Sequence, residues 1–150
     1  MEQITEDYVS FETAKLLKEK GFEPPHDYRK CMPIMYTNNG EIKWGIWSDD
    51  WYPRITLQMA MKWLREVHNV VIVVDYIYEC TDKSYCYKIY KLGENGKPER
   101  VPIEGVRYDT LGEPHVETVG HRDYSLSFFS YKTYEEACEA AIRYCLENLI

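Results

Sequence analysis

The sequence has no long apolar run, and it is poor in glycine and proline. Its longest uninterrupted apolar stretch, residues 70–74, is far shorter than the roughly 20 residues that a membrane-spanning helix needs. With 8 glycines and 7 prolines in 150 residues, the chain is neither collagenous nor of low complexity. Residues 1–7 are polar and acidic, so we expect no secretory signal. These absences favour a globular protein that lies outside the membrane.

Cysteine occurs in no pattern that builds a disulfide framework or a metal site. The count of 5 is odd, and a chain of 150 residues can bury a core without covalent cross-links. Cys80 and Cys86 are spaced too widely for the paired thiolates that zinc prefers, and His115 and His121 show the same spacing. We therefore expect reduced thiols, no metal, no cofactor and a cytoplasmic location.

Positive charge is also scarce, because 18 basic residues stand against 25 acidic ones and give a net charge of −7. A protein that binds the phosphate backbone needs a cationic face, so we do not expect binding to duplex nucleic acid. An acidic protein can instead imitate nucleic acid and inhibit a host DNA-binding protein. That alternative stays open, although acidic and basic residues are mixed along the predicted helices.

Three segments have the apolar spacing of amphipathic helices. The first lies between Ser10 and Gly21, the second runs from after Thr56 to about Val67 with Asn69 as its terminator, and the third runs from Thr133 to the end of the chain. The Ser10 hydroxyl can cap the first turn of the first helix, and Thr133 with Glu136 forms a capping box at the start of the third. Glycine and asparagine, which end the first two, tolerate the positive φ of a helix C-terminus.

Between the helices, β-branched and aromatic residues predict antiparallel hairpins. One hairpin joins residues 33–36 to 42–46 around an Asn-Asn-Gly turn, and a longer one joins residues 70–80 to 85–92. A short strand at residues 124–129 leads into the last helix.

The longer hairpin also receives a predicted register. Pairing Cys80 with Tyr85 places Tyr78 opposite Tyr87 and Tyr76 opposite Ile89. We expect this face, which Val70, Ile72 and Val74 continue, to point toward the core.

Helices and hairpins in separate blocks predict one α+β domain over residues 1–150. In this domain an antiparallel sheet built from hairpins carries three helices, packed mainly on one face. Residues 93–123 are rich in glycine and proline and lack strong periodicity. We interpret this segment either as a functional or mobile loop or as a pair of strands, since residues 101–108 partly alternate.

Three helical stretches carry a family resemblance: residues 9–22 (VSFETAKLLKEKGF), residues 56–69 (TLQMAMKWLREVHN) and residues 131–150. They resemble a group of small uncharacterised proteins from prophages and mobile elements of gut anaerobic bacteria. The resemblance covers somewhat under half of the chain. It implies the cytoplasm of a bacterial host, and it brings no known activity and no catalytic or binding residues.

Catalytic motifs are not evident in the sequence, which has no phosphate loop, dinucleotide fingerprint or nucleophile elbow. Asp49 and Asp50 beside Trp51 form a pair of carboxylates. Adjacent residues in a loop seldom converge on one bond, however, so we favour a turn-forming role for both. The sequence therefore favours a protein that is not an enzyme, and it predicts no catalytic residue. A small enzyme with a pocket under residues 93–123 stays the alternative.

Aromatic side chains give the clearest indication of function, because the chain has 14 Tyr and 4 Trp. Both residue types dominate the hot spots of protein interfaces. We predict a binding surface in one aromatic loop and a weaker patch on the long hairpin. The loop residues are Trp47, Asp49, Asp50, Trp51 and Tyr52, and the patch residues are Tyr76 and Tyr87. The sequence thus predicts a small phage or mobile-element accessory protein, a non-catalytic module that binds a host or phage protein. It leaves a homo-oligomer open.

Overall fold

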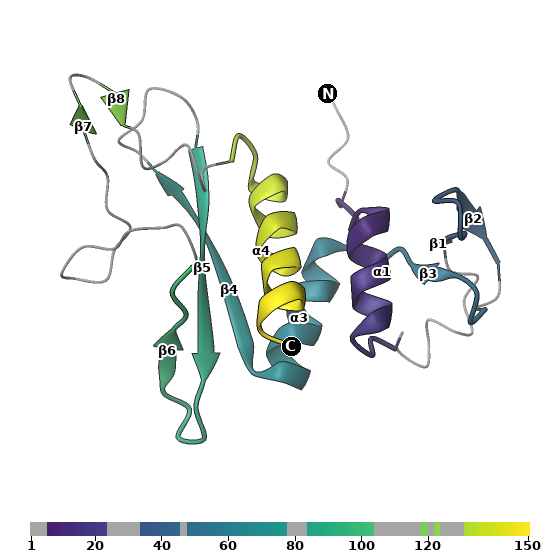
Figure 1. The fold of residues 1–150 in the computed structure, drawn as a ribbon, viewed down its shortest axis with the longest axis horizontal. Coiled ribbons are helices and arrows are strands. Elements are labelled where there is room, and N and C mark those ends of the chain that lie inside the picture. The colour runs from purple at the N-terminus through teal and green to yellow at the C-terminus, as the bar shows by residue number, and fades with distance from the viewer. Residues whose placement is uncertain are drawn as a thin grey trace. The chain divides into compact units, whose positions relative to one another are not determined.

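The fold is seen in a computed structural model of the chain (Figure 1). The structure describes residues 6–23, 34–45, 48–77, 84–103, 118–119, 122–123 and 131–150. The helices of these residues are α1 (Phe11–Glu19), α3 (Leu57–His68) and α4 (Tyr134–Asn148). The chain divides into two compact units, Met1–His68 with Ile142–Ile150 and Asn69–Ala141. The expectation of one domain over the whole chain stays a prediction.

All strand pairings of the described residues are antiparallel. In the first unit, β1 (Ile34–Tyr36) lies between β2 (Ile42–Trp44) and β3 (Tyr52–Pro53). In the second unit, β5 (Ser84–Leu92) lies between β4 (Val70–Ile77) and β6 (Pro98–Arg100), and β7 (Thr118–Val119) pairs with β8 (Arg122–Asp123). The predicted α+β class with antiparallel, hairpin-built sheets is confirmed, and the strands are divided among separate sheets.

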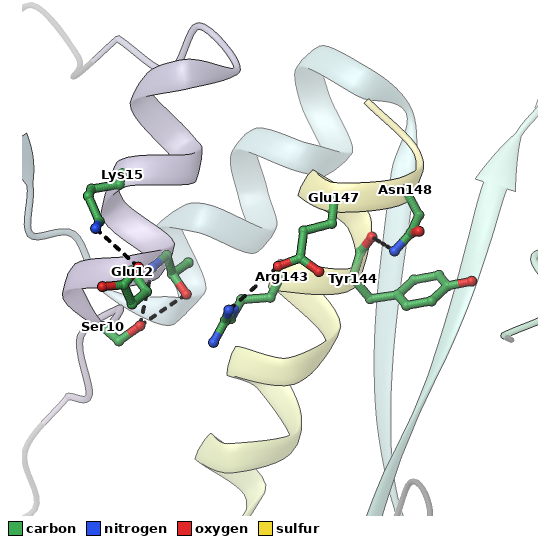
Figure 2. Close-up of polar contacts among 8 residues, drawn as sticks. Ser10, Glu12, Lys15, Arg143, Tyr144, Glu147 and Asn148 are labelled. Atoms are coloured by element: carbon green, nitrogen blue, oxygen red, sulfur yellow. Dashed lines mark hydrogen bonds and ion pairs between the residues drawn. The ribbon is translucent and has the colours of Figure 1, made fainter. Parts of the chain in front are cut away.

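Local capping fixes the helix starts where the sequence predicts them. The Ser10 hydroxyl oxygen accepts a hydrogen bond of 3.2 Å from the Thr13 N–H, at the start of α1 in Figure 2. The hydroxyls of Thr56 and Thr133 each accept a bond of 3.1 Å from the backbone N–H three residues further on. These bonds satisfy donors that the first turn of a helix leaves unpaired.

The predicted helix ends are confirmed as well. Gly21 follows α1 with a φ of 89°, and the Phe22 N–H donates to the Leu17 carbonyl at 2.9 Å. Asn69 follows α3 with a φ of 57°. Exposed ion pairs lie along the helices, Lys15 with Glu12 at 3.1 Å on α1 and Arg143 with Glu147 at 3.5 Å on α4 (Figure 2). Pairs of this kind add a few tenths of a kcal/mol at most.

The last helix has an apolar face, as its spacing predicts. Its fully buried side chains are Ala137, Cys138, Ala141, Ile142, Cys145 and Leu146, whereas Tyr134 at the start of α4 is 37% exposed. None of the helices in the described part of the chain is long and apolar enough to cross a membrane.

The predicted register of the long hairpin is wrong. Tyr87 lies opposite Val74, and Tyr76 lies opposite Tyr85. This register brings the Tyr76 and Tyr85 rings to 5.4 Å and lets Lys88 form an ion pair of 3.1 Å with Asp75. Cross-strand pairs of both kinds stabilise a sheet, which explains why this register is preferred.

Each residue of the same hairpin nevertheless lies on the sheet face that was predicted for it. The observed pairing differs from the predicted one by an even number of residues, so each side chain keeps its face. Val70, Ile72, Tyr87 and Ile89 are buried, as expected for the core side, whereas Tyr76 on the same face is 50% exposed, contrary to the expectation.

Strands do occur between residues 93 and 123, which is one of the two interpretations of that segment. β6 extends the β4–β5 sheet, and β7 and β8 form a short hairpin. Beyond Ile103, the alternating stretch lies outside the described residues, and so does the strand predicted at residues 124–129.

Candidate protein-binding surface

In the first unit, a row of side chains crosses one face of the sheet. The register places Tyr52, Tyr36 and Ile42 side by side, on β3, β1 and β2 respectively. Phe11 of α1 covers the first two, with ring centroids 5.6 Å from each tyrosine ring. The Tyr36 hydroxyl donates a buried hydrogen bond of 2.6 Å to the Val9 carbonyl. The N-terminal end of α1 is thereby held on the β1–β3 part of this face.

The same face continues onto β2, where its side chains are open to solvent. Ile42 is 54% exposed and Trp44 is 70% exposed. Because side chains alternate along a strand, both residues lie on one face of β2. Among the described strands, β2 pairs with β1 alone and is an edge strand. We call Ile42, Lys43 and Trp44 the β2 edge.

The backbone of the β2 edge also offers hydrogen-bonding groups to solvent. In the hairpin turn, the Thr37 N–H donates to the Glu41 carbonyl at 2.8 Å. In an antiparallel ladder, residues alternate between bonding their partner and pointing away from it. The N–H and C=O of Lys43 therefore point to β1, and those of Ile42 and Trp44 point outward. The edge thus presents donors, acceptors and apolar side chains from the same two residues.

A tight turn precedes β3 and carries the two predicted carboxylates. The Trp51 N–H donates to the Ser48 carbonyl at 3.0 Å, and the Asp50 N–H donates to the Ser48 hydroxyl at 3.3 Å. Asp49 and Asp50 are both exposed. We call residues 48–51 the acidic turn.

Lys18 of α1 holds the acidic turn in place. Its ammonium group donates to the backbone carbonyl of Asp49 and, at 3.1 Å, to that of Trp51. The same group lies 4.8 Å from the centroid of the Tyr52 ring. One cation thus joins the helix to both the turn and β3.

Trp51 attaches the acidic turn to the end of β2. A Cβ atom added to Gly45 would lie 2.8 and 2.9 Å from two atoms of the Trp51 ring, so only glycine allows this approach. Trp51 and Tyr52 are half-buried. Both therefore support the surface, whereas Asp49 and Asp50 are free to meet a partner. Trp47, the remaining loop residue of the prediction, lies outside the described residues.

The weaker patch of the sequence prediction lies in the second unit. Tyr76 is 50% exposed and packs edge-on against Tyr85, whereas Tyr87 is only 5% exposed and stacks on Tyr131 at 6.0 Å. Burial raises the pKa of Tyr131, and a hydrogen bond with Tyr87 opposes that rise. The structure therefore places Tyr76 at the surface and Tyr87 in the core of its unit.

The thiols of the described residues are shielded. Cys86, Cys138 and Cys145 are buried and form no disulfide. Burial raises the pKa of Cys138, and it raises that of Cys145 to about 12. A thiol with such a pKa is protonated at neutral pH and is a poor nucleophile.

The described residues contain no group of three or more His, Cys, Asp or Glu that could hold a metal ion. Several residues weighed as ligands lie outside the described ranges, namely Cys80, His115 and His121.

The sequence prediction missed Ile42 and Trp44. The alternation of Ile42, Lys43 and Trp44 predicts a strand with one apolar face, and such a face is usually buried. Exposure follows instead from the position of Phe11, which covers β1 and β3. The one local signal was Lys43, because a lysine at the centre of a short strand is typical of a sheet edge.

Comparison of the chain with protein-family models, with curated proteins and with solved structures finds no match. The resemblance to prophage and mobile-element proteins therefore stays a prediction. What bears on function is the geometry of the β2 edge and the acidic turn.

Proposed function

We propose that the chain is a protein-binding module that recognises its partner through the β2 edge and the acidic turn. The exposure of Trp44 and Ile42 on one face of an edge strand carries this proposal. Tryptophan contributes strongly to interfaces, because it buries a large area with only two side-chain torsions. Exposed apolar side chains that adjoin polar groups are typical of interaction sites.

The surroundings of this surface are held by contacts within the chain itself. Phe11 packs on β1 and β3, Lys18 binds the acidic turn, and Trp51 closes the turn onto Gly45. A preorganised surface loses little conformational entropy on binding, so more of the interaction energy contributes to affinity.

For the partner, we propose a protein of the bacterial host or of the phage or mobile element itself. The family resemblance supports this part of the proposal, and on the same ground we propose a location in the bacterial cytoplasm. A partner that meets the acidic turn would carry basic groups, since Asp49 and Asp50 are exposed.

Quantitative capture from a bacterial lysate tests the proposal. The tagged chain is compared with the double variant Ile42→Ser/Trp44→Ser and with Val67→Ser, a control that removes an exposed apolar side chain from α3. We expect at least one protein to be retained by the wild type and the control and to be reduced about tenfold or more on the double variant, as the loss of a hot spot implies.

Equal retention by all three chains, or enrichment of nothing by the wild type, would contradict the proposal. Thermal unfolding of each chain provides the control for folding. Because all three side chains are exposed, we expect the free energy of unfolding to change by no more than about 0.5 kcal/mol.

A further inference from the structure

We propose that the partner contributes an extended segment, which adds to the β2 edge as an antiparallel strand. This inference rests on the function proposed above. Read from its N-terminus, the segment has the order basic, any residue, apolar, acidic, apolar, basic. Three features determine this order. They are the backbone of β2, the two faces of this strand and the position of the acidic turn.

The backbone fixes the mode of binding. The N–H and C=O groups of Ile42 and Trp44 point away from β1, and β2 is the edge of its sheet among the described residues. An added strand that bonds these four groups continues the ladder of the sheet, which is how exposed edges recognise extended peptides. Two partner residues then form bonded pairs with Ile42 and Trp44.

The two faces of β2 fix the central residues of the segment. Partner residues opposite Ile42 and Trp44 share their exposed apolar face and are therefore apolar. Glu41 and Lys43 lie on the other face and are exposed. Residues directly opposite them are stabilising when their charge is opposite, so the partner places an acid opposite Lys43 and a base opposite Glu41.

The acidic turn fixes the N-terminal end of the segment. The Trp51 ring packs on Gly45, the residue that directly follows β2, and the exposed Asp49 and Asp50 precede Trp51 in the same turn. An antiparallel strand begins at this end of β2, so its first residue is basic. Lys18 also lies at this turn, where its ammonium group binds backbone carbonyls. The two carboxylates outnumber this one ammonium group, so the turn keeps a net negative charge.

A second copy of the chain fits the same edge poorly. An antiparallel pair of β2 strands that uses all three residues is centred on Lys43, so Ile42 of one copy lies opposite Trp44 of the other. Lys43 then faces Lys43, and like charges directly opposite destabilise a sheet. Lysine on an edge strand is a common defence against self-pairing. The charge pattern therefore favours a different protein.

The test uses the full chain, labelled with nitrogen-15, and the acetylated and amidated peptide Lys-Thr-Val-Glu-Val-Lys at millimolar concentration. We expect the backbone amide signals of Ile42 and Trp44 to shift on titration and their hydrogen exchange to slow. Methylation of both valine nitrogens removes the donors that face β2 and leaves every side chain in place. We expect it to weaken binding about tenfold to thirtyfold, as the loss of two hydrogen bonds implies.

The charge-reversed peptide Glu-Thr-Val-Lys-Val-Glu tests the order of charges. We expect it to bind about threefold to tenfold more weakly, because each exposed pair contributes only a little. Equal binding of the reversed peptide would overturn the charge order, and equal binding of the methylated peptide would overturn strand addition.

The two proposals fail in different ways. If the Ile42→Ser/Trp44→Ser variant loses a captured protein but no peptide shifts Ile42 or Trp44, strand addition is wrong and the binding function stands. If neither experiment responds, both proposals are wrong. Sedimentation of the wild type provides a third outcome, since a dimer that the double variant abolishes would make a second copy the occupant and overturn the inference.

Discussion

Replacing Lys18 with methionine tests whether α1 holds the acidic turn beside the β2 edge. The ammonium group of Lys18 binds the carbonyls of Asp49 and Trp51 and lies 4.8 Å from the Tyr52 ring centroid. Methionine keeps a long apolar side chain and a similar helix propensity. The variant therefore removes the cation and leaves most of the packing.

The expected loss of stability comes from three contributions. The bond to the Trp51 carbonyl is partly buried, and such a bond contributes about 1 kcal/mol. The Asp49 carbonyl is exposed and regains water, so the loss of its bond costs little. The cation above Tyr52 contributes about 0.5 kcal/mol at a partly exposed site. We expect Lys18→Met to lower the free energy of unfolding by about 1 to 2 kcal/mol.

Urea unfolding followed by circular dichroism measures this loss, and Lys62→Met is the matched control because Lys62 is exposed on α3. Amide hydrogen exchange adds a local measurement, since the Trp51 N–H that closes the turn should exchange faster in Lys18→Met. If both variants unfold at the same urea concentration and Trp51 exchanges at its wild-type rate, Lys18 does not hold the turn.

Three further predictions concern backbone fit and pH. Gly45→Ala forces a Cβ to 2.8 Å from the Trp51 ring and should cost about 1–3 kcal/mol in urea unfolding, whereas the control Gly93→Ala meets nothing closer than 3.7 Å and should cost less. Asn69 has a φ of 57°, so Asn69→Ala should be about 1 kcal/mol less stable than Asn69→Gly; equal stabilities would contradict this. Burial raises the pKa of Cys145 from 9.0 to about 12. At pH values between these two pKa values, the unfolded chain loses the thiol proton and the folded chain keeps it. The free energy of unfolding should therefore fall by about 1.4 kcal/mol per pH unit in this range. In Cys145→Ala the free energy of unfolding should fall less steeply with pH.

Helix ends could be predicted from sequence because their causes are local. Ser10, Thr56 and Thr133 each bond an N–H three residues away, and Gly21 and Asn69 adopt the positive φ that ends a helix. Such interactions depend on neighbours within one turn. The antiparallel class of the sheets was predictable for the same reason, since hairpin partners are close in sequence.

The register of the long hairpin depends on interactions that sequence spacing does not show. The backbone of Tyr85 exchanges hydrogen bonds of 2.7 and 2.8 Å with Tyr131, which lies far along the chain. The ion pair between Lys88 and Asp75 acts diagonally across the strands. Alternation fixed the face of each residue but left shifts by an even number of residues equally acceptable.

The sequence indicates the region of the candidate site, but not which of its residues are exposed and which pack against the fold. Aromatic density pointed to residues 47–52, and the structure packs Trp51 of the acidic turn on Gly45, directly after β2. Trp51 and Tyr52 of that region are half-buried and pack against their neighbours, whereas the strongly exposed Trp44 lies just before the region. Which aromatic residue is covered depends on where Phe11 lies, and no local pattern encodes that position.

In the proposed mode of binding, the exposed edge discriminates between partners because its attractive and repulsive elements lie in the same three residues. Ile42 and Trp44 favour any apolar strand, and on their own they would make β2 a site for aggregation. Lys43, between them, opposes every strand that places a cation opposite it, including a second β2. A partner with an acid at that position meets no such penalty, and specificity of this kind requires a penalty against the wrong partners as well as contact with the right one. The pattern is therefore better suited to one complementary segment than to general adhesion.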